Sequence, residues 1–217
     1  MPALAALFAL TIFCGSFLLF LVQPILAKEL LPRFGGSAGV WVVCLVFFQS
    51  ALLLGYAGAD GLSRLPRRTA AMLVPALALG AALLLPIIPA THWQLSAGAG
   101  PAREVLGALA ATVGLPYVLI AATSPLVQAW HAHCLPGRSP YRLYALSNLA
   151  SMLALFSYPS VVEPWVGTQA QALGWSAGYI AWALLISACA VAGHVYTASS
   201  ASPSQATVPA ARSAADM

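Results

Sequence analysis

The chain has 217 residues, of which 61% are hydrophobic and 6% are charged. Soluble domains carry about 25% charged residues, so this composition excludes an ordinary soluble globular domain. The net charge of +4 arises from few residues, and we interpret it as a determinant of membrane topology rather than as a nucleic-acid-binding surface. We therefore expect an all-α, polytopic membrane protein whose main surroundings are a lipid bilayer, with no nucleic-acid partner.

Six apolar segments are long enough to cross the roughly 30 Å hydrocarbon core as helices. The first two are separated by Pro32 and Gly35-Gly36, which interrupt a continuous helix and predict a short hairpin. The predicted spans are residues 4–27, 38–58, 69–89, 105–130, 143–162 and 172–195. Residues 1–196 thus form one transmembrane domain of about six helices. Residues 197–217 are rich in Ala, Ser and Pro and predict a disordered cytoplasmic tail.

Prolines mark the irregular parts of the later spans. The fourth span is interrupted at Gly114-Leu-Pro116 and at Ser124-Pro125, where we expect a kink or tilt. A loop from His131 to Arg142 is predicted to follow it.

Basic residues orient the bundle. Six spans place both termini on one side, and that side carries Arg64, Arg67 and Arg68 in the loop between the second and third spans. The same side carries Arg138, Arg142 and Arg212, whereas the opposite side carries Lys28, Arg33 and Arg103. Because cytoplasmic loops are enriched in Lys and Arg, both termini are expected in the cytoplasm.

Residues that could support metal or acid–base chemistry are sparse. His131 and His133 are two positions apart with no carboxylate nearby in sequence, which favours an incidental loop over a metal site. Glu29 and Glu163 fall at predicted membrane edges, and no charged residue lies at the centre of a span. Gly35-Gly36-Ser37 lacks the spacing of a phosphate-binding loop. The sequence therefore predicts no catalytic residue, no metal and no cofactor.

Uncharged polar groups within the spans are the candidate site. Polar side chains in a bilayer face other helices or a water-filled cavity, so these residues either link helices or line a solute path. Helix linking is the commoner role for any single polar residue, whereas Pro24 and Pro125 free backbone carbonyls and favour a solute path at the polar residues beside them. The candidate polar seam is Gln23, Pro24, Gln49, Ser124, Gln128, Ser147 and Asn148.

Small residues at helical spacing predict close contacts between helices. Ala51 with Gly55, and Gly174 with Gly178, are spaced four apart. Such pairs serve contacts within one bundle as well as contacts between subunits, and the sequence leaves both open.

Four sequence blocks carry a family resemblance. They are FLLFLVQPILAKELLPRFGGSAGVW, FFQSALLLGYAGA, GLPYVLIAATSPLVQAW and SPYRLYALSNLASMLALFSYPSVVEP, spread in order from Phe17 to about Gln171. These blocks resemble the membrane region of bacterial fused proteins that join a major-facilitator-like part to a spermidine-synthase-like domain. The resemblance implies one half of a major facilitator bundle in the bacterial inner membrane, with Arg64, Arg67 and Arg68 in the loop of the facilitator basic signature.

The resemblance also frames two functional hypotheses. After Tyr196 the sequence shows no glycine-rich nucleotide loop, so the aminopropyltransferase-like chemistry of the relatives is not expected and the chain is not predicted to be an enzyme. One hypothesis is a transporter-like protein that moves a small solute such as a polyamine or a related metabolite. The alternative is a non-transporting membrane anchor or regulatory module for a separate cytoplasmic spermidine-synthase-like enzyme. Because a facilitator needs two six-helix halves, we expect a homodimer or a complex with another membrane protein.

Overall fold

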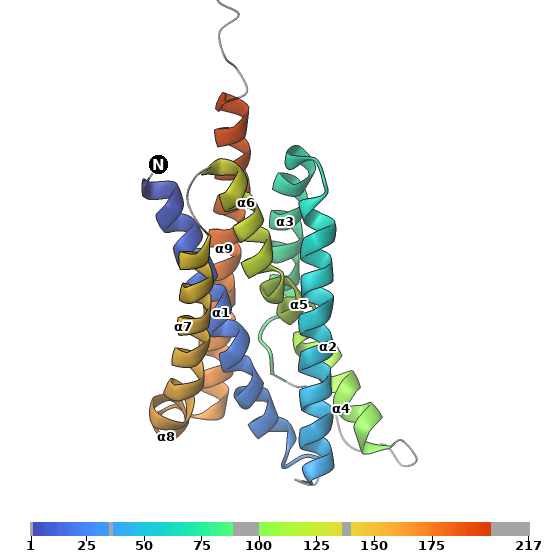
Figure 1. Cartoon of the computed structure of the whole chain (residues 1–217). Helices are drawn as coiled ribbons and strands as arrows, with labels where there is room; N and C mark the ends of the chain where they lie inside the picture. The colour runs from blue at the N-terminus through green and yellow to red at the C-terminus, as the bar shows by residue number, and fades with distance from the viewer. Residues whose placement is uncertain (1, 35–36, 89–99, 136–139, 201–217) are drawn as a thin grey trace, which may run out of the picture.

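The chain forms a bundle of helices in a computed structural model that describes residues 2–34, 37–88, 100–135 and 140–200. Within these residues six helices are long and apolar enough to cross a membrane, and no strand occurs. The prediction of an all-α, multi-pass membrane protein is confirmed. The two ends of the described chain lie at the same end of the bundle (Figure 1).

Several of the spans are built from more than one helical element. In chain order the elements are α1 (Pro2–Leu30), α2 (Ala38–Ser63), α3 (Arg67–Ala81), η1 (Ala82–Leu84), α4 (Pro101–Leu109), η2 (Ala110–Gly114), α5 (Leu115–Ala121), α6 (Thr123–Cys134), α7 (Tyr141–Ser157), η3 (Tyr158–Val162), α8 (Glu163–Trp165) and α9 (Thr168–Ser200). The fourth span comprises α4 to α6, and the fifth comprises α7 to α8. Elements η2 and η3 are π-helical turns.

Helices α1 and α2 diverge although they are consecutive (Figure 1). Helix α1 packs mainly against α7 and α9, whereas α2 packs against α4, α5 and α6. Ser37 caps α2 by accepting a 3.4 Å hydrogen bond from the Val40 amide. The predicted turn at Gly35-Gly36 lies outside the described residues. The first helix is therefore the centre of the bundle rather than one arm of a closed hairpin.

Prolines explain where observed helix ends differ from the predicted ones. The third span ends at Leu84 rather than at residue 89, because Leu85 is extended immediately before Pro86. The fourth span begins at Pro101, a residue type well suited to the first helical position. Within that span the π-helical turn η2 precedes Pro116, and the single residue Ala122, with helical backbone angles, separates α5 from α6 before Pro125.

Two further predicted boundaries are wrong. A loop was predicted from His131, but His131 to Cys134 form the last turn of α6, because the His131 ring is buried and packs edge-on against Phe8. The tail was predicted to begin at residue 197, but α9 continues to Ser200. The predicted disorder of residues 201–217 lies outside the described residues.

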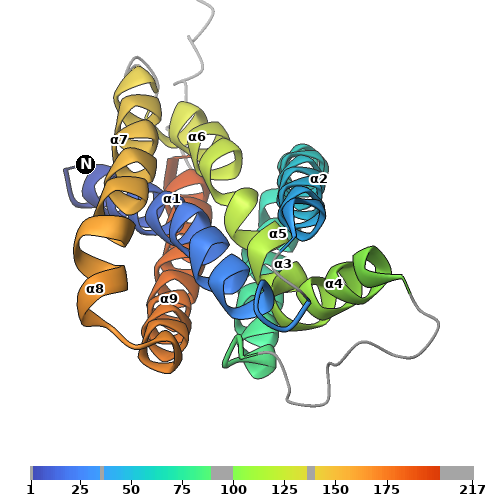
Figure 2. The same ribbon diagram turned by 90° about the horizontal axis from the view of Figure 1, so that it is seen from below.

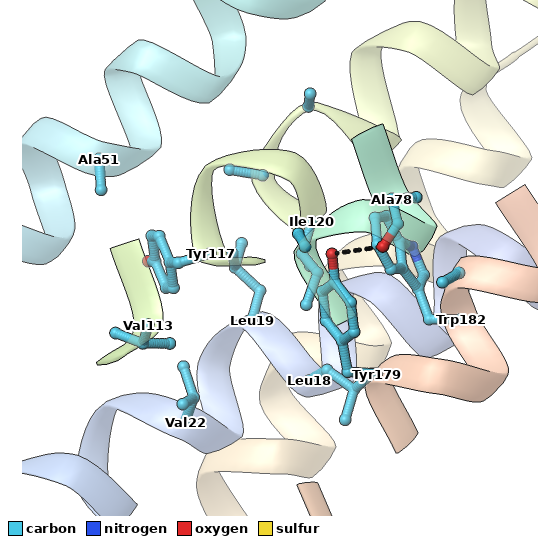
Figure 3. Packing of buried hydrophobic residues seen from close by; sticks show 14 of the residues in the cluster. Leu18, Leu19, Val22, Ala51, Ala78, Val113, Tyr117, Ile120, Tyr179 and Trp182 are labelled. Atoms are coloured by element: carbon cyan, nitrogen blue, oxygen red, sulfur yellow. Dashed lines mark hydrogen bonds between the residues drawn. The ribbon is translucent and has the colours of Figure 1, made fainter. Parts of the chain in front are cut away.

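Three aromatic residues on one face of α9 connect it to three other helices. The Trp175 indole N–H donates to the carbonyl of Leu18 on α1 at 2.8 Å. The Tyr179 hydroxyl donates to the carbonyl of Ala78 on α3 at 3.2 Å, as Figure 3 shows. The Trp182 indole N–H donates to the Thr123 hydroxyl on α6 at 3.1 Å. Each buried aromatic ring thus has its polar atom satisfied, which is the condition for burying Tyr and Trp without a desolvation cost.

Candidate functional site

A groove with a volume of about 450 Å³ lies among five of the helices. Buried Leu19, Ile120 and Ala121 form its base, and exposed Tyr56 on α2 and Tyr144 on α7 stand at its sides. Helices α1 and α6 lie between α7 and α2 when the bundle is viewed along its length (Figure 2). We call this feature the polar groove, and its polar lining consists of Ser16, Tyr56, Ser124, Gln128, Tyr144, Ser147, Asn148 and Ser151.

The polar groove brings together the predicted seam residues of α6 and α7. Ser124 and Gln128 are one turn apart on α6, and the Gln128 amide N–H donates to the Ser124 hydroxyl at 2.9 Å. Across the groove, Ser147 and Asn148 lie side by side on α7. These two helices therefore present uncharged hydrogen-bonding groups to the same space.

A pair of serines ties the groove to the first helix. The hydroxyls of Ser16 on α1 and Ser147 on α7 lie 2.8 Å apart. Ser151 donates back to the Ser147 carbonyl at 2.9 Å, as serines in membrane helices commonly do. Ala150 and Ala154 are fully buried on α7, so that helix meets its neighbours through small side chains.

The other predicted seam residues lie outside the polar groove. The Gln23 amide donates to the hydroxyl of buried Tyr117 at 3.2 Å, and so connects α1 to α5. The Pro24 carbonyl lies 3.4 Å from the Tyr158 hydroxyl. Gln49 is exposed on α2, two turns from Tyr56 and on the same face of that helix. Gln23 therefore fits the helix-linking interpretation, whereas Gln49 faces the exterior of the bundle.

Two amides in the groove retain unused hydrogen-bonding capacity. Asn148 is exposed, and within the described residues its side chain makes no hydrogen bond. Gln128 uses its N–H group on Ser124, and its amide oxygen has no partner in the same part of the chain. Buried or membrane-embedded amides normally find partners, so these groups are available to water or to a bound molecule.

Sequence reasoning missed several residues of the groove. Ser16, Tyr56, Tyr144 and Ser151 line it but were not among the candidates. On α7 the signal was present, because Tyr144, Ser147 or Asn148, and Ser151 recur at spacings of three and four and share a helix face. No comparable pattern marks Ser16 or Tyr56, which stand alone among apolar neighbours.

The predicted arginine loop is mostly helical. Arg64 caps α2 and pairs with Asp60 at 2.7 Å with both side chains exposed, and Arg67 and Arg68 begin α3. Arg67 extends inward, placing one guanidinium nitrogen 3.9 Å from the sulfur of Cys134 on α6. The junction of α2 and α3, which carries the three arginines, lies at the bundle end that holds both ends of the described chain (Figure 1).

A second polar cluster lies at the opposite end of the bundle. Glu163 on α8 pairs with Lys28 on α1 at 2.6 Å and accepts a 2.9 Å hydrogen bond from the Tyr158 hydroxyl. Glu29 pairs with Arg33 one turn along. Glu29 and Glu163, both predicted at membrane edges, thus belong to two separate ion pairs, because each carboxylate has a cation of its own.

The described residues hold no cluster of three or more His, Cys, Asp or Glu side chains that could bind a metal ion. No protein-family model, curated protein or solved structure matches the chain. The polar groove, within the membrane spans, is therefore the candidate functional site.

Proposed function

We propose that this chain is a transporter-like membrane protein and that the polar groove binds the small solute that it moves. The observation that carries the proposal is the convergence of Ser124, Gln128, Ser147 and Asn148 on one space of about 450 Å³. That volume falls within the 300–1,000 Å³ typical of small-molecule sites. Both contributing helices belong to membrane spans.

The free amide groups of the groove need partners. An unsatisfied polar group in the hydrocarbon region costs several kcal/mol, so a polar side chain in a span needs a hydrogen-bonding protein group or water. Asn148 and the Gln128 oxygen lack protein partners in the described residues. A wet site that exchanges water for solute accounts for them.

Pro125 gives the groove a second feature of solute sites. A proline within a helix has no N–H to donate, so the carbonyl one turn earlier, that of Ala121, loses its usual helical partner. The groove is lined around this position by Ile120, Ala121, Ser124 and Pro125, while the backbone of Ala122 between α5 and α6 stays helical.

Two exposed amides support the proposal that a second membrane body completes the carrier. Asn148 in the polar groove and Gln49 outside it would both be open to lipid in a single bundle, at an energetic cost that a covering partner removes. We propose a second copy of this chain or another membrane protein as that partner, with rocking of one body against the other giving alternating access.

We further propose that the chain resides in the bacterial inner membrane with both termini in the cytoplasm. The support is the position of Arg64, Arg67 and Arg68 at the end of the bundle where the described chain begins and ends.

Uptake into cells with and without the chain tests the transport proposal. Washed bacteria expressing the full chain receive labelled spermidine, the solute class that the family resemblance suggests, or labelled sorbitol, in parallel with cells expressing Asn148→Leu. We expect accumulation of at least one solute above the empty-vector level and its loss in Asn148→Leu. Equal accumulation in all three strains for both solutes would contradict the proposal and favour the role of a membrane anchor for a separate enzyme.

A further inference from the structure

None of the described residues that line the polar groove has a charged side chain. Its polar atoms come from hydroxyl groups and from the amides of Gln128 and Asn148. Carboxylates give the strongest stabilisation of the ammonium groups of a bound polyamine, and Arg, Lys or several N–H donors do the same for an organic acid.

Nearby charges are not available to supply what the lining lacks. Asp60 lies one turn beyond Tyr56 on α2, but it is not part of the groove lining, and its 62% exposed side chain pairs with Arg64 at 2.7 Å. Glu163 is paired with Lys28 at 2.6 Å, on a different element from those that line the groove. A charged solute in the groove would therefore be separated from water without a counter-charge.

The groove does offer both donors and acceptors. The Asn148 amide supplies two N–H groups and a carbonyl, the Gln128 oxygen accepts, and the serine and tyrosine hydroxyls do either. Such a mixture matches a molecule whose own groups donate and accept at the same atom. Hydroxyl groups have that property, whereas ammonium and carboxylate groups do not.

From the lining chemistry we infer that the polar groove takes an uncharged polyhydroxy solute, of the size of a sugar alcohol or a monosaccharide, in preference to a polyamine. The inference rests on the proposed transport function and names its substrate class. The Asn148 amide is the main discriminating group, because it is exposed to the groove and hydrogen-bonded to nothing else in the described chain.

Three probes with one carbon skeleton isolate the effect of charge. Sorbitol, gluconate and glucamine each carry a six-carbon polyhydroxy chain and are neutral, anionic and cationic at pH 7. Uptake of each, and of spermidine, is measured by mass spectrometry of the contents of proteoliposomes that contain the purified full chain. Protein-free liposomes of the same lipid give the background for every probe.

The expected result is sorbitol uptake above background that exceeds uptake of both charged analogues and of spermidine by about tenfold or more, since a charge inside a membrane protein is strongly disfavoured without a partner. Spermidine or glucamine uptake that exceeds sorbitol uptake overturns the inference while leaving the transport function intact. Background levels for every probe overturn both.

A charge introduced at Asn148 tests the named group. Asn148→Asp changes the amide to a carboxylate of nearly the same shape and should reverse the preference, lowering sorbitol uptake and raising glucamine uptake. The matched control is Gln169→Glu, the same chemical change on an exposed side chain near the start of α9, away from the groove. It should keep the wild-type order of preference.

Asn148→Ser guards against a folding artefact, because it keeps a neutral hydrogen-bonding group and should still prefer sorbitol over the charged analogues. All variants are first checked for a single, sharp elution peak in mild detergent. An unchanged order of preference in correctly folded Asn148→Asp overturns the assignment of Asn148.

Discussion

Gly55 is the described glycine at which an added Cβ atom would come closest to a neighbouring atom. A Cβ atom added to Gly55 on α2 would lie 2.5 Å from the Cβ of Ala121 and 2.7 Å from the carbonyl oxygen of Val118, both on α5. Backbone and Cβ atoms cannot rotate away, so α2 would have to move off α5. Because Tyr56 and Ala121 both line the polar groove, the same movement would widen the site.

The expected size of the effect follows from two opposing contributions. Overpacking costs about 1–3 kcal/mol, and contacts this short with rigid atoms belong at the upper end of that range. Alanine is favoured over glycine within a helix by about 1 kcal/mol. We therefore expect Gly55→Ala to lower the free energy of unfolding by about 2 kcal/mol in total.

The chain supplies two matched controls. Gly58 lies one turn away on the same helix with no atom within 4 Å of an added Cβ, so Gly58→Ala should be neutral or stabilising by up to about 1 kcal/mol. An added Cβ at Gly178 would meet the terminal Cδ2 atom of Leu18 at 2.8 Å, and a methyl group at the end of a flexible side chain can shift. Gly178→Ala should therefore cost less than Gly55→Ala.

Unfolding of the purified variants by sodium dodecyl sulfate in mixed micelles, followed by tryptophan fluorescence, measures these differences. The predicted order of stability is Gly58→Ala, then Gly178→Ala, then Gly55→Ala. Equal stability of Gly55→Ala and Gly58→Ala would refute the close approach of α2 to α5.

Three further predictions address the core, the ion pair and the topology. Trp182→Phe should destabilise the bundle by about 1–3 kcal/mol, because it removes side-chain volume and the hydrogen bond to Thr123. The control Trp165→Phe, at an 83% exposed site, should change stability by less than about 0.5 kcal/mol, and the detergent titration described above measures both variants. A double-mutant cycle of Lys28→Met and Glu163→Gln should give a small coupling that shrinks in high salt, because the side chains are 40% and 37% exposed, and a salt-independent coupling would contradict this. A reporter fused after Met217 should be active in the cytoplasm, and periplasmic activity would show that the orientation is inverted.

Composition and segment length were sufficient to predict the six spans, because apolar segments of about 20 residues with few charges are rare outside membrane-spanning helices. The ends of the spans were less predictable. Pro86 ended the third span early, and buried His131 allowed α6 to continue through a segment that looked like a loop. Small residues at Gly55 and Gly178 proved to contact α5 and α1 within the bundle, whereas Gly174 has open space around it.

The sequence predicted that the site consists of uncharged polar side chains, but not which of these side chains come together. Ser124 with Gln128, and Ser147 with Asn148, were identifiable as polar residues within spans. Their convergence with Ser16, and the separate use of Gln23 on Tyr117, depend on how α1 is rotated in the bundle. Helix α1 is apolar around its whole circumference apart from a few positions, so its sequence does not indicate which face meets which neighbour.

The most direct test of the central claim asks whether the polar groove contains water. The four native cysteines, Cys14, Cys44, Cys134 and Cys189, are first replaced by alanine or serine. A single cysteine is then introduced by Asn148→Cys or by Leu149→Cys, which lie at the same depth on α7 but on different sides of the helix.

Asn148 lines the groove, whereas Leu149 is 49% exposed on the outer surface of the bundle and is not part of the lining. Maleimide reagents react with the thiolate, which forms in water and not in hydrocarbon. We predict fast labelling by N-ethylmaleimide in native membranes for Asn148→Cys and slow labelling for Leu149→Cys. Equal rates at the two positions, or faster labelling at position 149, would contradict a water-filled polar groove and with it the proposed site.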